Sequence, residues 1–239
     1  MAAKTGIPST SEIILESIEQ IRRDNPEMLE PDFVRSRFSD ALEKVFSVTY
    51  ETYKRYEKGA IDSFAEGAFL SGWSSSLGRE EALEMFRTAV TEAIKMEKSL
   101  SQSRSSRAGS SFETIVQELL SIIGIPSERV TRGDKRDGLS RIDLVIPDRE
   151  TAATSPDGAH FLSLKTSLRD RWRRRLFLHN QGQVIHLLTI LQNEVLSNRV
   201  AQSIVDRGIF LYVPDRVKDD RFADEPRIRK LSDLPASMT

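Results

Sequence analysis

The sequence predicts an α/β fold, with a mixed central sheet of about five strands flanked by helices and an N-terminal helical region. Two patterns indicate this class. Over the first hundred residues, apolar side chains recur at intervals of three and four, which is the spacing of a helix face. Beyond residue 140, short apolar runs at residues 141–147, 161–165 and 209–214 have the length of strands, with helical stretches between them.

The composition is that of a globular protein and narrows the possible functions. Charged residues make up 30% and hydrophobic residues 38% of the 239 positions. The formal net charge is −1, so attraction to a polyanion must come from a local patch of charge. The chain has no cysteine, which excludes disulfides, thiolate zinc sites and a cysteine nucleophile. Because we find neither an apolar run of membrane-span length nor a signal-peptide core, we expect a cytosolic protein.

Three helices are expected in the N-terminal region. The first covers residues 11–25 and ends there because Pro26 disfavours helical geometry at the residue before it. The second covers residues 31–58, and residues 60–76 are mixed in pattern. The third covers residues 80–100 and carries one apolar stripe. The members of this stripe are Leu83, Phe86, Val90, Ile94 and Met96.

A stretch rich in serine and arginine, Ser101–Ser111, predicts a break between two parts of the chain, residues 1–103 and 104–239. A helix over residues 111–123 should follow, ended by Gly124.

The second part should supply the sheet. Alternation along residues 161–165 places Ser163 and Lys165 on one face of a strand, opposite two leucines. Residues 171–180 are predicted to start a helix, and residues 184–205 to be largely helical, before a strand at residues 209–214.

Asp143 and Lys165 could carry chemistry, because adjacent strands would bring both to one end of the sheet. A carboxylate there could hold Mg²⁺, which prefers oxygen ligands, and the lysine could stabilise charge on a phosphate during hydrolysis. The alternative is a strand-edge aspartate beside a lysine that extends to solvent. Ser163 stands where such metal nucleases often have a second acid. Glu113 is a candidate second carboxylate, although Ser110 and Glu113 also fit a helix capping box.

A basic block, Lys165–Arg175, holds six cationic side chains and one carboxylate. Arginine can pair with guanine, and aspartate with cytosine, in a DNA major groove. Arg169, Asp170 and Arg171 could therefore read G·C pairs, and the arginines at 173–175 could contact phosphates. The alternative is a solvated, salt-bridged helix start.

These residues resemble a known group of enzymes. Asp143 with Ser163-Leu-Lys165 resembles the PD-(D/E)xK nuclease core. The segment Lys165–Arg173 resembles the catalytic-lysine and recognition segment of type II restriction endonucleases of the EcoRII, SsoII and PspGI group. Ser106–Glu113 is similar to the same group's Ser-Arg-Ala-Gly helix start with its glutamate. Residues 188–193 and 209–214 also resemble segments of the same group, in the same order and at similar spacing. The resemblance covers residues 104–235.

The resemblance implies Mg²⁺-dependent, sequence-specific double-strand cleavage of DNA at a C/G-rich palindrome with a CCGG or CC-N-GG core. Its residue roles fall in three sets. The catalytic set is Asp143, Lys165, Glu113 and Ser163, with Asp143 and Glu113 as metal ligands. The base-recognition set is Arg169, Asp170 and Arg171, and the DNA-backbone set is Arg173, Arg174 and Arg107.

The resemblance also implies a cytoplasmic prokaryotic enzyme with a cognate DNA methyltransferase. A palindrome is most simply matched by a homodimer. The helices of residues 1–103 would then serve dimerisation or contacts with flanking DNA. One position departs from the group's pattern: Leu178 stands where a second metal-binding glutamate is usual, beside His179. Two other interpretations therefore remain, a DNA-binding protein that has lost cleavage and a repair or junction nuclease of the same superfamily.

Overall fold

We describe a computed structural model of the chain, in which the described residues are all except 1–5, 71–77, 131–141, 169–183, 191–195 and 239. The first helix, α1 (Thr10–Asp24), agrees with the prediction. Ser9 caps it: the Glu12 amide donates to the Ser9 hydroxyl at 3.3 Å, and the Ser9 amide donates to the Glu12 carboxylate at 2.7 Å. A short 3-10 turn, η1 (Pro26–Leu29), follows.

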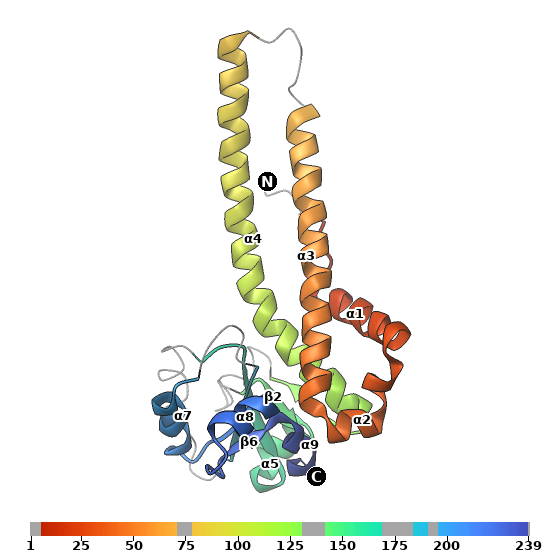
Figure 1. Cartoon of the computed structure of the whole chain (residues 1–239), viewed down its shortest axis with the longest axis vertical. Helices are drawn as coiled ribbons and strands as arrows, with labels where there is room; N and C mark the ends of the chain where they lie inside the picture. The colour runs from red at the N-terminus through yellow and green to blue at the C-terminus, as the bar shows by residue number, and fades with distance from the viewer. Residues whose placement is uncertain (1–5, 71–77, 131–141, 169–183, 191–195, 239) are drawn as a thin grey trace.

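The next helices differ from the prediction in their ends. The expected helix over residues 31–58 is two helices, α2 (Pro31–Ser36) and α3 (Phe38–Leu70), because Arg37 leaves helical geometry at a φ of −132°. The long helix α3 continues through residues 60–70, where we expected a mixed pattern. It forms a projecting arm with α4 (Arg79–Ile122), as Figure 1 shows.

The predicted break at Ser101–Ser111 was wrong, because α4 runs through it without interruption. Serine is only mildly unfavourable in a helix, and tertiary contacts outweigh that preference. Arg104, within the stretch, pairs with Glu57 of α3 at 2.7 Å. On either side of the stretch, Leu100 and Phe112 are fully buried. The proposed division at residues 103 and 104 therefore falls inside a helix.

The sheet has six strands in sequence order and mixed direction, which confirms the predicted fold class. The first three strands pair antiparallel, and the last four run parallel. The strands are β1 (Glu128–Arg129), β2 (Leu144–Ile146), β3 (His160–Lys165), β4 (Ile185–Thr189), β5 (Phe210–Val213) and β6 (Ile228–Lys230). The connecting helices and 3-10 turns are α5 (Arg149–Thr154), η3 (Pro156–Gly158), α7 (Asn198–Val205), α8 (Asp215–Arg221), η4 (Leu231–Asp233) and α9 (Leu234–Ser237).

One strand was predicted as helix. Residues 184–205 contain β4 and then α7 instead of one long helix. All five residues of β4 are buried, since it is a parallel strand covered on both faces. A strand of this kind has a continuous apolar run, which periodicity alone cannot distinguish from a buried helix.

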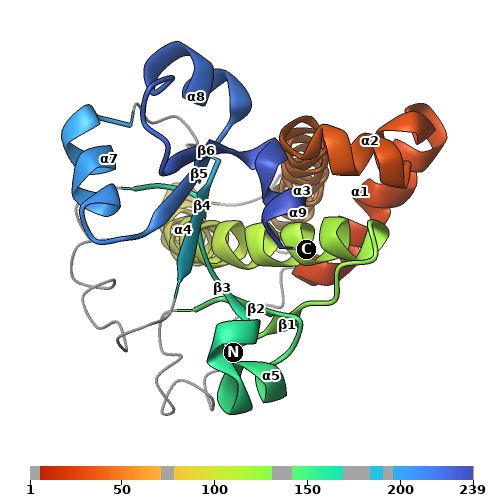
Figure 2. The ribbon, with the colours of Figure 1, turned by 90° about the horizontal axis from the view of Figure 1, so that it is seen from below.

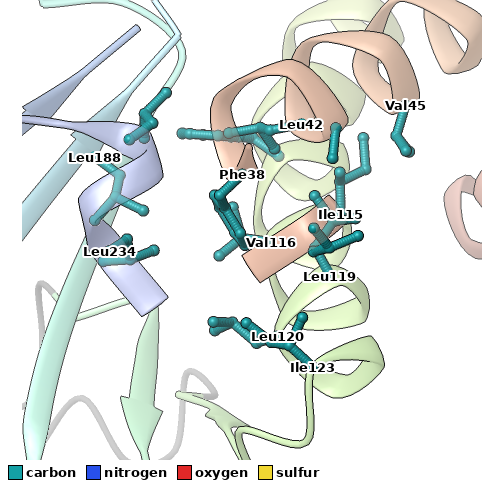
Figure 3. Close-up of a cluster of buried hydrophobic side chains, with 14 of the residues drawn as sticks. Phe38, Leu42, Val45, Ile115, Val116, Leu119, Leu120, Ile123, Leu188 and Leu234 are labelled. Carbon is teal, nitrogen blue, oxygen red and sulfur yellow. The ribbon is translucent and has the colours of Figure 1, made fainter. Parts of the chain in front are cut away.

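Two hydrophobic clusters cover the two faces of the sheet. The first joins α1–α4 and α9 to the sheet through side chains such as Phe38, Phe112 and Leu188, and Figure 3 shows part of it. The second packs α5 and α7 against the opposite face. Figure 2 shows the sheet between these two groups of helices. Among the described residues, none of the helices combines the length and apolarity needed to cross a membrane.

Candidate active site

The first candidate residue, Asp143, is fixed by the sheet just before β2. Its backbone amide donates to the Leu162 carbonyl at 2.8 Å, and its own carbonyl accepts from the Val130 amide at 3.1 Å. These two bonds hold the residue between β1 and β3. Its side chain is 14% exposed, so the carboxylate is largely removed from water.

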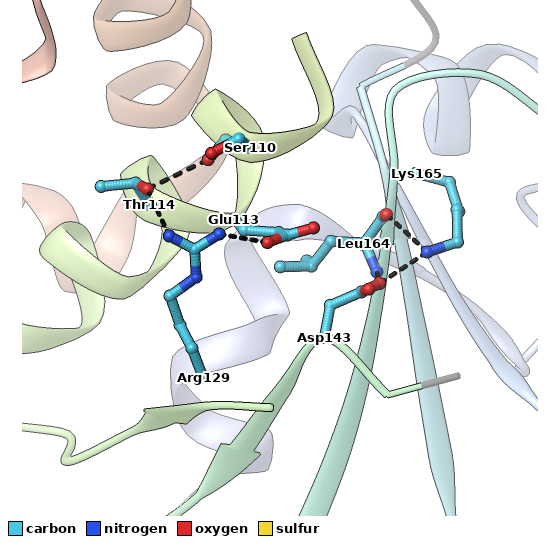
Figure 4. Close-up of polar contacts among 7 residues, drawn as sticks. All are labelled: Ser110, Glu113, Thr114, Arg129, Asp143, Leu164 and Lys165. Carbon is cyan, nitrogen blue, oxygen red and sulfur yellow. Dashed lines mark hydrogen bonds and ion pairs between the residues drawn. The ribbon is translucent and has the colours of Figure 1, made fainter. Parts of the chain in front are cut away.

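Lys165 meets this carboxylate from the end of β3. Its Nζ donates to Asp143 Oδ2 at 2.5 Å and to the Leu164 carbonyl at 2.9 Å. The Leu164 amide donates to the same Oδ2 at 2.7 Å. The structure thus brings Asp143 and Lys165 together, and it holds the carboxylate with a backbone donor that sequence reasoning did not identify (Figure 4). A lysine ammonium has three donors, and these contacts use two of them.

Ser163 lies on β3 two residues before the lysine and is fully buried. Its hydroxyl donates to Asp143 Oδ2 over a long 3.4 Å. This contact can orient the aspartate weakly but adds no negative charge to the site. A second carboxylate must therefore come from another element.

Glu113 supplies a carboxylate from α4. It forms an ion pair with Arg129 of β1, and Arg129 also donates to the Thr114 hydroxyl at 3.1 Å. Figure 4 shows Glu113 reaching from α4 toward the strand that carries Leu164 and Lys165. The capping-box alternative was wrong, because Ser110 and Glu113 lie inside a helix that begins at Arg79. Arg129 was missed because a lone arginine in a two-residue strand gives no sequence signal.

The oxygen atoms at this site suit a hard divalent cation. Asp143, Glu113 and the Leu164 carbonyl offer only oxygen donors, which is the ligand chemistry of Mg²⁺. Each carboxylate is now balanced by a cation, Asp143 by Lys165 and Glu113 by Arg129. Within the described ranges there is no cluster of three or more acidic, histidine or cysteine side chains that could hold a metal ion. The residues present therefore fit a site with few protein ligands, completed by water and a phosphate.

The remaining predicted residues fall into two groups. Arg169, Asp170, Arg171, Arg173 and Arg174 lie outside the described residues, as do Leu178 and His179.

Arg107, by contrast, lies within α4, near the base of the arm. It donates to the Pro8 carbonyl at 2.6 Å and to the Ser103 hydroxyl at 3.0 Å. Its guanidinium lies 5.5 Å from the centre of the Tyr53 ring. Arg107 thus ties the segment before α1 to α4.

The fold is therefore a mixed sheet flanked by helices, with an aspartate and a lysine that meet at one strand end. Two solved structures share this fold. Metal-depleted Ecl18kI in complex with uncleaved, modified DNA is 18% identical, with a TM-score of 0.74 over 98% of this chain and 79% of that chain. A complex of the restriction endonuclease PspGI with substrate DNA is 24% identical, with a TM-score of 0.68 over 97% of this chain and 92% of that chain. A comparison with curated proteins gave no match.

The model of the EcoRII C-terminal family matches residues 75–232, which is more than half of the chain. The chain therefore belongs to this family of type II restriction endonucleases, and it is a site-specific DNA endonuclease. The match begins before residue 104, where the sequence resemblance was expected to start, and it takes in all of α4. The solved structures also extend over the N-terminal helices, so these helices are part of the shared fold.

Proposed function

We propose that the chain makes Mg²⁺-dependent double-strand cuts at a C/G-rich palindrome with a CCGG or CC-N-GG core. The observation that carries the proposal is the contact of Asp143 with Lys165 at the end of β3. It supports the proposal because a carboxylate that could bind a metal ion lies beside a cation that could stabilise a phosphate. The family already makes the chain an endonuclease, so the proposal concerns its ion, its residues and its target.

Asp143 and Glu113 would hold the ion, with the Leu164 carbonyl as a further oxygen. When bound, Mg²⁺ polarises the scissile phosphate and lowers the pKa of the attacking water. The hydrogen bond from the Leu164 amide would keep the Asp143 carboxylate in the same orientation during the reaction. Lys165 would turn its ammonium from Asp143 toward the phosphate, where it stabilises the negative charge that grows in the transition state. A requirement for metal is supported by the fact that DNA stays uncleaved in metal-depleted Ecl18kI.

The basic block would connect recognition to cleavage. Arg169, Asp170 and Arg171 follow Lys165 by four to six positions and would read G·C pairs by direct hydrogen bonds. Arg173, Arg174 and Arg107 would contact DNA phosphates. Because the reading residues follow the lysine so closely, binding of the correct bases would position Lys165 at the scissile bond. The DNA complexes of Ecl18kI and PspGI support DNA as the substrate.

The assembly we propose is a two-fold homodimer, in which each copy reads one half of the palindrome. The helices that precede the sheet would serve dimerisation or contacts with flanking DNA, and the sheet with the end of α4 would form the nuclease part. A cognate DNA methyltransferase, in the cytoplasm of a prokaryotic cell, would protect the host's own sites.

Plasmid cleavage tests the proposal. With Mg²⁺ we expect discrete fragments, and Lys165→Ala should lower the cleavage rate by about 10²–10³-fold, the usual cost of removing one group that stabilises transition-state charge. Arg216→Ala is the control, since the Arg216 side chain is 92% exposed and lies on α8. Specific binding without any cut would instead indicate a DNA-binding protein. Cleavage confined to branched DNA would indicate a repair nuclease.

A further inference from the structure

The outer part of the arm carries a stripe of exposed apolar side chains on α4, which we call the arm stripe. Its members are Leu83, Phe86, Val90 and Ile94, with exposed fractions of 46%, 65%, 40% and 65%. Their spacing of three and four residues puts them on one side of the helix. The sequence predicted an apolar stripe on this helix, and the structure leaves these four side chains exposed. A row of four exposed apolar side chains is unusual on a monomer and marks an interaction surface.

Near the base of the arm, α3 and α4 cover each other's facing sides. Leu100 of α4 and Tyr53 of α3 are buried, and Arg104 pairs with Glu57 across the two helices. Further out, the half-buried side of α4 is made of other residues, Ala82, Met85, Ala89 and Met96. At 100° per residue, this side lies roughly a third of a turn from the arm stripe. The stripe is therefore a separate face, which α3 does not cover.

Charged side chains lie beside the arm stripe, and on one flank those nearest its two ends differ in sign. On one flank, Glu80 and Glu84 lie toward the tip, and Lys95 and Lys98 lie toward the base. Two of the four have partners on their own helix, Glu84 with Arg87 at 3.5 Å and Lys95 with Glu92 at 2.6 Å. These ion pairs are exposed and contribute little to the free energy of folding. Exchanging them for ion pairs with a second copy would therefore cost little free energy. Arg79 and Glu97 lie in line with the two ends of the stripe. A parallel two-fold pair would place each of these charges beside its own copy, whereas an antiparallel pair would place Arg79 opposite the partner's Glu97.

The stripe is also nearly symmetric about its centre between Thr88 and Ala89. In an antiparallel pair around a two-fold axis, Leu83 faces the partner's Ile94 and Phe86 faces the partner's Val90. The same alignment brings Glu80 opposite the partner's Lys98 and Glu84 close to the partner's Lys95. Apolar side chains and charges thus match in one register. A surface that is its own complement is what a two-fold interface requires.

We propose that the arm stripe is a self-association surface and that the arm stripe of a second copy of this chain covers it in antiparallel orientation. This interface specifies which surface joins the two copies of the proposed homodimer, and its role in cleavage rests on the proposed function. The apolar side chains and charges that support it do not depend on cleavage.

The absence of cysteine makes disulfide trapping a direct test. A mixture of Leu83→Cys and Ile94→Cys proteins, oxidised without DNA, should give a covalent dimer that joins one variant to the other. Each variant alone should give little, because an antiparallel pair separates identical positions near the ends of the stripe. Strong cross-linking of each variant with itself, and little in the mixture, would show a parallel pair and overturn the proposal.

Sedimentation equilibrium provides the second measurement. Phe86→Glu should raise the dimer dissociation constant by roughly 30-fold or more, the effect of losing a central anchor of an interface. Thr88→Glu, an exposed position on the opposite side of the helix, should leave it unchanged. Glu80→Lys should weaken the dimer about fivefold, and Lys98→Glu added to it should restore the affinity. Circular dichroism would confirm that each variant keeps its helices.

The outcomes separate this proposal from the proposed function. A dimer that resists Phe86→Glu and still cuts at a palindrome would overturn the arm interface and leave the function intact. A dimer trapped through residues 83 and 94 that cuts no DNA would support the interface and contradict the function. A wild-type chain that stays monomeric at high protein concentration would overturn the interface.

Discussion

At the scale of single residues, the two carboxylates of the site are held in different ways. Asp143 is fixed by a backbone amide and a lysine that belong to the neighbouring strand. Glu113 is held by Arg129, and its side chain is 25% exposed. A partly exposed glutamate in an ion pair can leave Arg129 and bind another cation, whereas the donors of β3 hold Asp143 in place. We therefore regard Asp143 as the fixed residue of the site and Glu113 as a residue that can turn toward it.

Glu113→Gln tests that difference. If Glu113 binds the ion, the variant should need about tenfold or more Mg²⁺ for half-maximal cleavage, because a neutral amide is a weaker ligand for a hard cation. Thermal unfolding should change little, because the ion pair is partly open to solvent and such a pair contributes on the order of 1 kcal/mol. Arg129→Gln is the matched control, since it breaks the same ion pair and leaves the carboxylate. An unchanged Mg²⁺ requirement with a lower melting temperature would assign Glu113 a purely structural role.

At the scale of elements, the unbroken α4 is the largest departure from the sequence prediction, and glycine tests it. Gly109 lies inside α4, and an added Cβ would meet no atom within 4 Å. Gly109→Ala should therefore stabilise the protein by about 0.5–1 kcal/mol in denaturant unfolding. Gly124 lies just after α4 with a φ of +75°, so Gly124→Ala should destabilise it. A destabilising Gly109→Ala change would contradict the continuous helix.

A second element-scale feature is a ring cluster across the parallel strands. His186 of β4 is 4% exposed, and its Nδ1 lies 3.2 Å from the Tyr212 hydroxyl. Burial lowers the pKa of His186 from 6.5 to about 3, and His160 and Arg229 add to the effect. Between these values the unfolded chain binds a proton that the folded chain does not. The stabilising effect is complete above about pH 6.5 and declines as the pH falls toward 3.

Replacing this histidine tests the pH dependence. Between pH 7.5 and pH 5, wild type should lose about 2 kcal/mol more unfolding free energy than His186→Phe, because each pH unit below the unfolded pKa costs about 1.4 kcal/mol. Urea unfolding at both pH values measures the difference. His160→Phe, which replaces a less buried histidine of the same cluster, should reduce the pH dependence by a smaller amount. Equal losses in wild type and His186→Phe would show that His186 titrates normally in the folded chain.

Physical reasons decide what the sequence could and could not predict. Strand alternation placed Ser163 and Lys165 on one face, and chain order brought Asp143 to the same strand end. The arrangement of β4 and α4 was missed, because tertiary burial determines them: a fully buried strand has no alternation, and packing on both sides keeps a serine-rich segment helical. The pairing of Glu113 with Arg129 depends on how the chain turns back between α4 and β1, and the local sequence pattern does not predict it.

At the scale of the whole molecule, a formal net charge of −1 means that the chain as a whole does not attract DNA. We therefore expect the attraction to DNA to come from the basic block and from neighbouring surface residues that face the DNA. Two copies related by a two-fold axis would present two such blocks to one duplex. The contributions of base-reading and phosphate-contacting arginines should then be separable by their dependence on sequence and on salt.

Two variants of the basic block make that separation. Arg173→Ala with Arg174→Ala should weaken binding uniformly over all sequences and reduce the salt slope of log K by about 1–2 for each copy, because each phosphate contact releases about one counterion. Arg171→Ala should instead lose roughly 1–3 kcal/mol of discrimination at one base pair and leave the salt slope nearly unchanged. Binding to a set of single-base variants of the site, at several salt concentrations, measures both effects. If Arg171→Ala weakens all sequences equally, Arg171 contacts the backbone, and base reading must lie elsewhere in the chain.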